Sequence, residues 1–489
     1  MNSSRTRAYH VVIASLLCVP VALAAKPDAN AGTVFVKASE IHVGNGQVIK
    51  DGAVLIKDGK IAAVGAGLKA PSNAQVVDMG DSVMTPGLID ANTVLEPDDV
   101  VTRGPRSARQ VLHDIFCPQH RDQPVVGCCG SLCPNSESHV TGHSCPQCGF
   151  PEVPLDVDLA VGVRRGADRA EHASEIVPHT RIIDAVNLRS PDLGRLLEGG
   201  VTTIFVTPDS ASVISSQGAI VRTGGPMGDR IVKDADAVKA ALGRDPINRG
   251  RSNGVPFRKF VTFHSRRPTT RMGVTWVFRK AMHDTRRFMQ GLDVYGADAP
   301  SPQAMKVLAK VFQKKIPLRI LAREQRDILT ALRLSEEFQL PFILEEATEA
   351  HLCARELGAA NVPVIYGPII DRRIGFRGTS GEGDDAKLGG MAALLDAGIQ
   401  TALTANDLRD EAGLARQAMC AIRYGVTEED ALKSVTLVPA QILGIGDTHG
   451  SIEKGKHADI VVWKGRPFDA TAVPAVVMIN GKIVLDRRG

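Results

Sequence analysis

The chain has 489 residues, of which 44% are hydrophobic and 23% are charged, so it is long enough to bury a large core. This length suits one barrel with an accessory domain as well as two or three independent domains. The formal net charge of only +4 predicts neither a nucleic-acid partner nor a membrane partner held by charge.

The first residues predict export. Arg5 and Arg7 precede an apolar run from Val11 to Ala22, and Ala22-Leu23-Ala24 resembles a small-x-small cleavage site. This layout is typical of a secretory signal peptide, assigned here to residues 1–24, and it predicts a periplasmic or extracellular protein. The alternative is a membrane anchor, but the apolar run is too short to span a bilayer, and no later run is long enough.

Residues 25–84 and 448–489 have the same design. Short β-rich runs flank Asp58-Gly59 near the start and Asn480-Gly481 near the end, and Asp-Gly and Asn-Gly are turn pairs of tight β-hairpins. Two small β units would each leave exposed strand edges. We therefore expect the two chain ends to pair into one small β-sandwich, with the middle of the chain inserted between them.

Residues 85–447 alternate between strand and helix patterns. The expected strands are at 201–206, 317–321, 341–344, 362–366 and 399–403, and helical patterns follow at 327–338, 348–357 and 388–397. Such alternation predicts a parallel sheet with helices outside, and a (β/α)8 TIM-like barrel suits it better than an open sheet. No glycine-rich phosphate loop opens any of these helices, which disfavours a dinucleotide-binding sheet.

Several motifs resemble one enzyme group. They are Pro86-Gly87-Leu88-Ile89-Asp90, Gly200-Val201-Thr202-Thr203, residues 268–273 and 431–436, and an ending from Gly450 to Ile460 that reads Gly-Ser-Ile-x-x-Gly-Lys-x-Ala-Asp-Ile. Together they resemble the amidohydrolase superfamily, in its imidazolonepropionase-like branch, with the metal-dependent hydrolase fold. The resemblance implies hydrolysis of non-peptide C–N bonds in small cyclic amides at a metal held by residues at the ends of the barrel strands.

The positions that would bind this metal have changed. In the register of the resemblance, they fall on Asn92, Val94, Leu321, a residue near Glu346, and Asn406 or Asp407 one step on. An amide is a poor zinc ligand, and an aliphatic side chain is none. We therefore expect the catalytic barrel metal to be absent, and without it water keeps a pKa near 15.7.

The strand ends are instead acidic. The carboxylates there are Asp90, Glu324, Glu345, Glu346 and Asp407. They could hold a hard cation such as magnesium, or pair an acid of raised pKa with a base, and Glu346 and Asp407 are then the catalytic candidates. The alternative is that these residues cap or flank helix starts.

A Cys-rich and His-rich insert occupies residues 113–155. Cys117 and His120 form one pair with two intervening residues, and Cys145 and Cys148 form another; the alternates are Cys129 and Cys133. This spacing predicts a ribbon-type zinc site. Because an exported chain meets an oxidising compartment, three disulfides are the alternative. The insert follows the first barrel strand, so it could form a lid, a docking module for a protein partner or a replacement metal centre.

Two functions remain open from the sequence. One is a hydrolase of small cyclic amides, in which the ordinary metal-hydroxide site is lost. The other is a non-catalytic binding or assembly protein that uses the insert for zinc or a partner. In either case, a small-molecule ligand is possible at the barrel.

Overall fold

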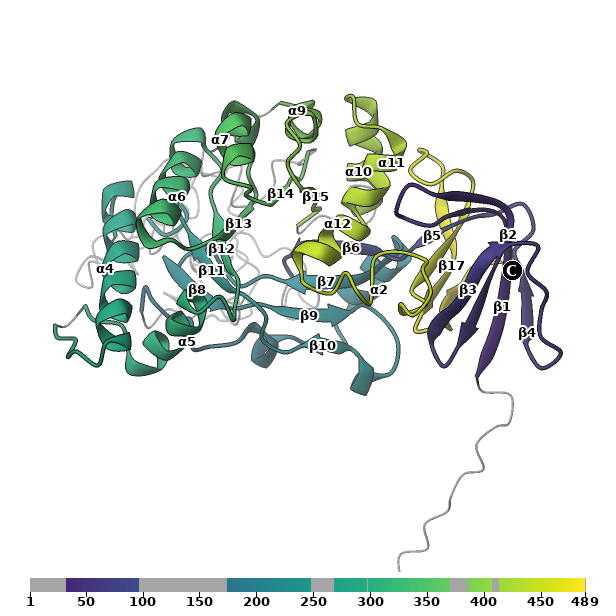
Figure 1. The fold of residues 1–489 in the computed structure, drawn as a ribbon, viewed down its shortest axis with the longest axis horizontal. Coiled ribbons are helices and arrows are strands. Elements are labelled where there is room, and N and C mark those ends of the chain that lie inside the picture. The colour runs from purple at the N-terminus through teal and green to yellow at the C-terminus, as the bar shows by residue number, and fades with distance from the viewer. Residues whose placement is uncertain are drawn as a thin grey trace, which may run out of the picture.

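The computed structural model describes residues 32–95, 174–247, 268–296, 298–369, 382, 387–406 and 413–488. Three sheets account for the strands (Figure 1). One sheet gathers strands from the two ends of the chain at one side of the molecule, and the other two sheets lie in the middle part beneath an outer row of helices. Within the described residues, no helix is both long enough and apolar enough to cross a membrane.

The first sheet has eight strands, in the order β18-β17-β16-β5-β1-β2-β3 with β4 on β1. Their bounds are β1 (Thr33–His42), β2 (Val48–Lys57), β3 (Lys60–Ala66), β4 (Gln75–Asp78), β5 (Val83–Pro86), β16 (Ile460–Lys464), β17 (Val473–Ile479) and β18 (Lys482–Asp486). Asp58 and Gly59 have φ of 50° and 78°, and Asn480 and Gly481 have φ of 49° and 70°. These positive angles are those a tight hairpin requires, so both predicted turns are present.

The two chain ends meet where β5 pairs antiparallel with β16. Across this seam, the Trp463 indole N–H donates to the Thr85 hydroxyl at 2.8 Å, and both side chains are buried. The predicted pairing of the two ends is therefore present. Hydrogen bonds join all eight described strands into one sheet, so the finer assignment to a sandwich of two facing sheets stays a prediction.

The middle of the chain forms two further sheets. A four-stranded sheet has the order β10-β9-β7-β6, and a six-stranded sheet has the order β15-β14-β13-β12-β11-β8. Their bounds are β6 (Leu88–Thr93), β7 (Val201–Val206), β8 (Ile214–Gln217), β9 (Ala219–Arg222), β10 (Ile231–Lys233), β11 (Val238–Ala241), β12 (Leu318–Leu321), β13 (Phe342–Glu345), β14 (Val364–Tyr366) and β15 (Thr401–Leu403). The run from β11 to β15 is parallel throughout, as is the pair of β6 and β7.

One interior cluster takes side chains from both of these sheets. Phe205 of β7 and Ile220 of β9 share it with Ile343 of β13 and Ile365 of β14. The first and last strands of this part of the chain, β6 and β15, are also in contact, because the Val94 backbone N–H just after β6 donates to the Asn406 carbonyl just after β15 at 3.2 Å. The strands thus surround a common interior in a TIM-like arrangement, although ladder hydrogen bonds of the described residues do not close them into a single barrel.

The sheets are mixed rather than uniformly parallel as the (β/α)8 prediction required. Strand β7 pairs antiparallel with β9, and β11 pairs antiparallel with β8. Only residues 207–213 separate β7 from β8, and a parallel crossover needs a dozen or more residues. The chain therefore turns back on itself here instead of crossing over through a helix.

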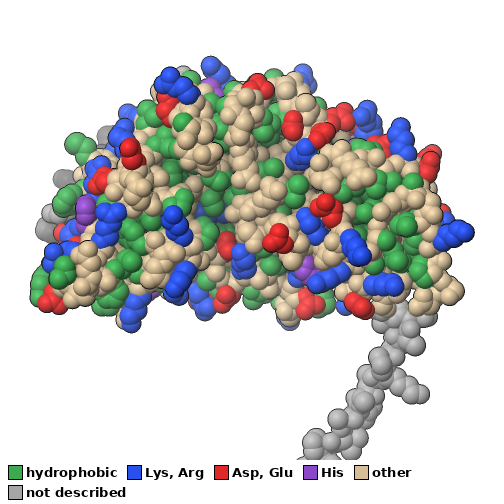
Figure 2. Space-filling model, viewed as in Figure 1, with side chains coloured by type: hydrophobic (Ala, Val, Ile, Leu, Met, Phe, Trp, Pro, Cys, Tyr) green, Lys and Arg blue, Asp and Glu red, His purple; other side chains and the backbone are tan. Residues whose placement is uncertain are grey.

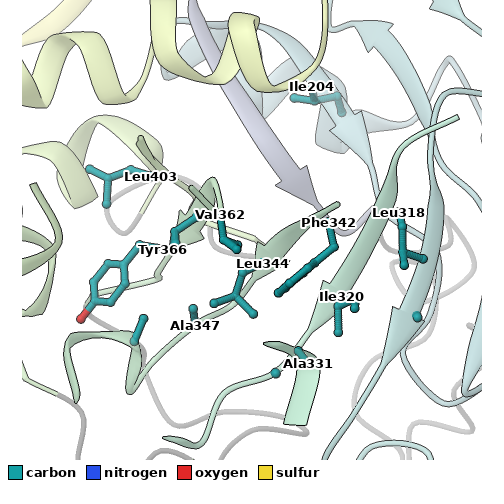
Figure 3. Packing of buried hydrophobic residues seen from close by; sticks show 14 of the residues in the cluster. Ile204, Leu318, Ile320, Ala331, Phe342, Leu344, Ala347, Val362, Tyr366 and Leu403 are labelled. Carbon is teal, nitrogen blue, oxygen red and sulfur yellow. The ribbon is translucent and has the colours of Figure 1, made fainter. Parts of the chain in front are cut away.

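Helices pack against the outer face of the strands. Alternate strand residues such as Leu318, Ile320, Phe342 and Leu344 point to this layer (Figure 3). The helices are α2 (Pro191–Glu198), α4 (Arg271–Met289), α5 (Pro302–Phe312), α6 (Gln325–Phe338), α7 (Ala354–Ala359), α9 (Gly390–Asp396), α10 (Leu414–Arg423), α11 (Glu428–Ser434) and α12 (Leu437–Ile442), with 3-10 turns η6 (Ile182–Ala185), η7 (Met227–Asp229) and η8 (Ala350–Cys353). The helix expected at 348–357 is divided between η8 and α7.

Candidate functional site

Three polar side chains from separate strands meet at the C-terminal ends of the barrel strands. The Glu346 carboxylate, just after β13, accepts a hydrogen bond from the Asn406 amide at 2.7 Å and one from the Asn92 amide at 3.4 Å, both through Oε1. All three side chains are buried. The sequence predicted that these positions would face one another, and the fold brings them into direct contact.

Arg323, which follows β12, is the centre of this cluster. Its guanidinium donates to both oxygens of Asp245 at 2.9 Å, to Glu346 Oε2 at 2.8 and 3.0 Å, and to Glu382 Oε2 at 2.9 Å. The Arg323 side chain is only 4% exposed. One buried cation is therefore shared by three buried carboxylates, and the two oxygens of Glu346 are both engaged by N–H donors.

The electrostatics of the cluster follow from this count of charges. Burial by itself lowers the pKa of Arg323, but the attraction of Asp245, Glu346 and Glu382 outweighs it and holds that pKa well above its ordinary value. Burial raises the pKa of Glu382, and Asp245 raises it further, while Arg323 opposes the shift. Arg323 thus stays charged, and the Glu382 carboxyl holds a proton more readily than an exposed carboxyl.

A second buried ion pair lies deeper in the strands. The Arg319 guanidinium of β12 donates to Glu345 of β13, and it also donates to the Ala91 carbonyl at 2.5 Å. Lys239 Nζ of β11 lies 3.3 Å from the other Glu345 oxygen, and the Arg319 guanidinium lies 3.8 Å from the centre of the Phe205 ring. Since residues alternate sides along a strand, these charges share the interior face while their neighbours pack against the helices.

Asp90 of β6 connects the first and last barrel strands. Its carboxylate accepts hydrogen bonds from the Thr404 hydroxyl at 2.6 Å, from the Ala405 backbone N–H at 3.0 Å and from the Asn92 backbone N–H at 3.0 Å. Burial raises the pKa of Asp90, although these hydrogen bonds and Arg319 lower it in part. The geometry gives Asp90 a positioning role, because its carboxylate binds the backbone at Asn92 in β6 and at Ala405, next to Asn406.

The backbone at this site is strained. Glu346 and Asn406 have φ of 52° and 56°, in the left-handed region that few residues other than glycine adopt. Each side-chain amide also has an unsatisfied atom, since Oδ1 of Asn92 and Oδ1 of Asn406 are buried without a hydrogen-bond partner among the residues that the structure describes. Strained backbone and unsatisfied polar atoms concentrate at functional sites, so these features support this cluster as the candidate site.

The predicted site residues have different outcomes. Asn92, Glu346 and Asn406 come together, Val94 joins them through its backbone, and Leu321 is a buried aliphatic residue at the end of β12. Asp407 lies outside the described residues, as do the predicted zinc ligands Cys117, His120, Cys145 and Cys148 and the alternates Cys129 and Cys133.

From the sequence, Arg323 could face an anionic ligand or form a surface ion pair, and the surface ion pair is the favoured interpretation. That interpretation is wrong, because the side chain is buried at the centre of the cluster. The sequence analysis also missed Asp245, Glu382, Arg319 and Lys239. The one available signal was the presence of two arginines, Arg319 and Arg323, on and just after the strand predicted at 317–321. A charged residue inside an apolar strand needs a buried partner of opposite charge.

The donor set does not fit the zinc site that the resemblance implies. Val94 and Leu321 have no ligand atom, and Asn92 and Asn406 offer amide groups. Glu346, which lies at the remaining metal-ligand position, already accepts hydrogen bonds from the Arg323 guanidinium and from two side-chain amides. Among the described residues, no group of three or more His, Cys, Asp or Glu side chains has an arrangement that could hold a metal ion.

Comparisons with known proteins agree with this fold. The model of the amidohydrolase family matches residues 384–484. A solved structure described as an amidohydrolase from Thermotoga maritima MSB8 superposes with a TM-score of 0.68 at 28% identity, covering 93% of this chain and 100% of that one. The chain belongs to the amidohydrolase superfamily.

Two curated relatives give narrower matches. Amidohydrolase tasK from Hapsidospora irregularis is 25% identical over 66% of this chain, and imidazolonepropionase from Pseudomonas putida (strain GB-1) is 41% identical over 17% of it. The aligned part spans 34% of the tasK protein and 22% of the imidazolonepropionase. These relatives therefore share only part of their length with this chain.

Proposed function

We propose that this protein binds a small cyclic amide at the C-terminal ends of its barrel strands and does not hydrolyse it by a metal-hydroxide mechanism. The observation that carries the proposal is the Arg323 guanidinium, which lies 2.8 Å from Glu346. The partial similarity to imidazolonepropionase supports cyclic amides as the ligand class. The unsatisfied oxygens of Asn92 and Asn406 support a ligand with N–H groups, because such oxygens accept hydrogen bonds.

Electrostatics supports the part of the proposal that concerns the metal. A divalent ion on Glu346 would lie within a few ångströms of the Arg323 guanidinium, and two cations at such a distance repel strongly in a site of low dielectric. The ion would also have to replace the N–H donors that both Glu346 oxygens now hold. In this proposal, Arg323 supplies the positive charge that the family otherwise obtains from metal.

The test separates the barrel from the Cys-rich insert. The variant is the full chain with Cys117, Cys128, Cys129, Cys133, Cys145 and Cys148 changed to serine, so that metal bound by the insert does not count. We expect metal analysis of this variant to find far less than one zinc per chain, and we expect lactams and cyclic imides to bind without zinc-dependent turnover. Stoichiometric zinc together with hydrolysis that a chelator abolishes and zinc restores would overturn the proposal.

A second candidate is metal-independent hydrolysis with an acidic residue as general base. The positive φ of Glu346 favours it, since strain of this kind accompanies catalytic residues. The informative variants are Glu346→Gln and Asp407→Asn, assayed on the same lactams. Turnover that either substitution reduces at least a hundredfold supports this candidate, whereas turnover unchanged in both removes it.

We propose in addition that the chain is exported and that its insert binds zinc, as the leader at residues 1–24 and the Cys/His spacing predict. Expression with the native leader should give a periplasmic or secreted chain that begins near residue 25, by mass spectrometry. Zinc should be present in the parent and lost from the six-serine variant. An insert that holds no zinc and has no free thiols under non-reducing conditions would establish disulfides instead.

A further inference from the structure

A cleft with a volume of about 910 Å³ lies between the eight-stranded sheet and the segment that contains strands β9 and β10. One wall comes from the hairpins at Gly59 and Gly481, and the other comes from residues around Asp229 and Ile231. Arg222, at the end of β9, lines the cleft together with His457 and Asn480. Cavities of a few hundred to about 1,000 Å³ are the size that small-molecule sites have.

This cleft is distinct from the barrel site. Arg222 of β9 pairs with Thr203, near the start of β7, because these two strands are antiparallel. The barrel site lies at the other end, where Thr93 of β6 pairs with Val206 at the end of β7. The two sites are therefore at opposite ends of the same sheet.

The inner part of the cleft is a buried cluster of basic groups. The Arg222 side chain is 7% exposed, its Nη1 donates to the Asp229 carbonyl at 2.9 Å, and its Nη2 lies 3.2 Å from His449 Nε2. The Nε–H group of Arg222 is buried and has no hydrogen-bond partner within the described ranges. The His449 and His457 rings lie 4.7 Å apart, so His457 continues the cluster from Arg222 toward the cleft.

The buried carboxyl of Asp459 lies beside this cluster. Asp459 is buried and its Oδ1 accepts the Asn480 backbone N–H at 2.8 Å, while its Oδ2 lies 3.8 Å from His449. Burial raises the pKa of Asp459, although Arg222 and His457 lower it in part. Asp58 and Asp229 are exposed at the rim, where water screens their charge.

Apolar side chains also line the cleft. Val34, Ile56, Val77, Met478 and Ile483 contribute to the cleft beside the basic groups. A ligand that fills it must therefore combine an anionic group with a hydrocarbon part. Charged hydrogen bonds from a buried arginine are the strong and specific contacts that a carboxylate can use.

We propose that this cleft is a binding site for a small monocarboxylate with an aliphatic or aromatic tail. Its carboxylate lies toward Arg222 and His457, and its tail lies against the apolar residues of the eight-stranded sheet. The exposed Lys482 adds positive charge at the entrance. The site requires neither the barrel ligand nor a metal.

Calorimetric titration of the full chain at pH 7 with hexanoate tests this proposal. Hexanoate should bind with one site per chain, while acetate, hexanol and hexylamine should each bind at least tenfold more weakly, because each lacks the tail or the negative charge. Arg222→Gln should weaken hexanoate binding roughly tenfold, which is about the size of one lost charged hydrogen bond, and His457→Gln should weaken it several-fold through the loss of a hydrogen bond from a neutral ring. Neither change should alter binding at the barrel.

Control variants keep the outcome interpretable. Lys464→Glu changes an exposed lysine of the same sheet outside the cleft, and it should leave hexanoate affinity within twofold of the parent. If Arg222→Gln does not fold, Lys482→Glu replaces it and should weaken binding several-fold through charge alone. Hexanol binding as tightly as hexanoate, or parent-like affinity in a folded Arg222 or His457 variant, would overturn the proposal.

Discussion

At the scale of single residues, the structure concentrates its buried charge around Arg323. The guanidinium forms ion pairs with Asp245, Glu346 and Glu382 at once, and each of these side chains is at most 5% exposed. A buried ion pair contributes little net stability over an apolar pair, but removing one partner leaves uncompensated charge. Replacing Arg323 should therefore lower the stability of the protein much more than the net contribution of its ion pairs would indicate.

We predict that Arg323→Gln lowers the free energy of unfolding by about 3 to 5 kcal/mol, because Asp245 and Glu346 lose their charged partner and Glu382 keeps only Arg271. The matched control is Arg355→Gln. Arg355 is 90% exposed and forms one surface ion pair with Glu356, so its loss should cost less than about 0.5 kcal/mol. Urea unfolding at pH 7 measures both, and equal effects would contradict the central role of Arg323.

His449 predicts a pH dependence. Burial, followed by His457 and Arg222, lowers its pKa to about 3 from an ordinary value of 6.5. Between these values the unfolded chain binds a proton that the folded chain does not, so stability is full above about pH 6.5 and falls as the pH drops toward 3. His457 shifts in the same direction, while the raised pKa of Asp459 acts in the opposite sense at lower pH.

We predict that His449→Gln reduces the loss of stability between pH 6.5 and 5, a window chosen to lie above most carboxyl titrations. His283→Gln is the control, since the His283 side chain is 59% exposed, and it should follow the parent curve. Thermal midpoints across this pH range provide the measurement. Parallel curves for the parent and the His449 variant would refute the prediction.

At the scale of elements, the junction of β8 and β9 depends on close packing. Gly218 lies between these strands, and a Cβ placed there would come within 2.0 Å of the Phe205 ring, on which Arg319 stacks. The ring cannot move without disturbing the interior ion pair of Arg319 and Glu345. The close packing at Gly218 and the interior electrostatics are therefore linked.

We predict that Gly218→Ala destabilises the protein by about 1 to 3 kcal/mol through overpacking. Gly194→Ala is the matched control, because Gly194 is exposed within α2 and a Cβ there meets nothing within 4 Å. That substitution should instead add up to about 1 kcal/mol, since alanine favours a helix over glycine. Denaturant midpoints of the two variants should thus move in opposite directions.

At the scale of the whole molecule, the two chain ends complete one sheet. Strand β5, which leads directly into β6, has β1 on one side and β16 on the other. Because β5 lies between these strands, the stability of the barrel depends on contacts between residues more than 350 positions apart in sequence, such as Thr85 and Trp463.

The surface visible in Figure 2 carries Lys and Arg side chains interspersed with Asp and Glu side chains, and no large area of that face has charges of one sign only.

We predict that ending the chain at residue 455, which removes β16, β17 and β18, abolishes cooperative unfolding of the whole protein. The removal would expose the β5 edge and the apolar cluster that Ile460 and Met478 complete. A chain ending at Arg487 keeps all three strands and should unfold like the parent. Circular dichroism melts compare the two, and a cooperative melt of the shorter chain would disprove the dependence.

The sequence by itself determined the pairing of the chain ends, most of the parallel strands and the superfamily, but not strands β8 to β11. Local turn chemistry at Asp58-Gly59 and Asn480-Gly481, apolar strand runs and the Pro86-to-Asp90 motif are short-range signals, and they identified the paired chain ends and the superfamily. The tertiary structure alone decided which charges meet. Arg323, Asp245 and Glu382 lie far apart along the chain. Whether such a charge is buried can be predicted only when its oppositely charged partner is known, and tertiary packing determines that partner. For the same reason, the cleft beside Arg222 became visible only when strands from both chain ends were placed against β9.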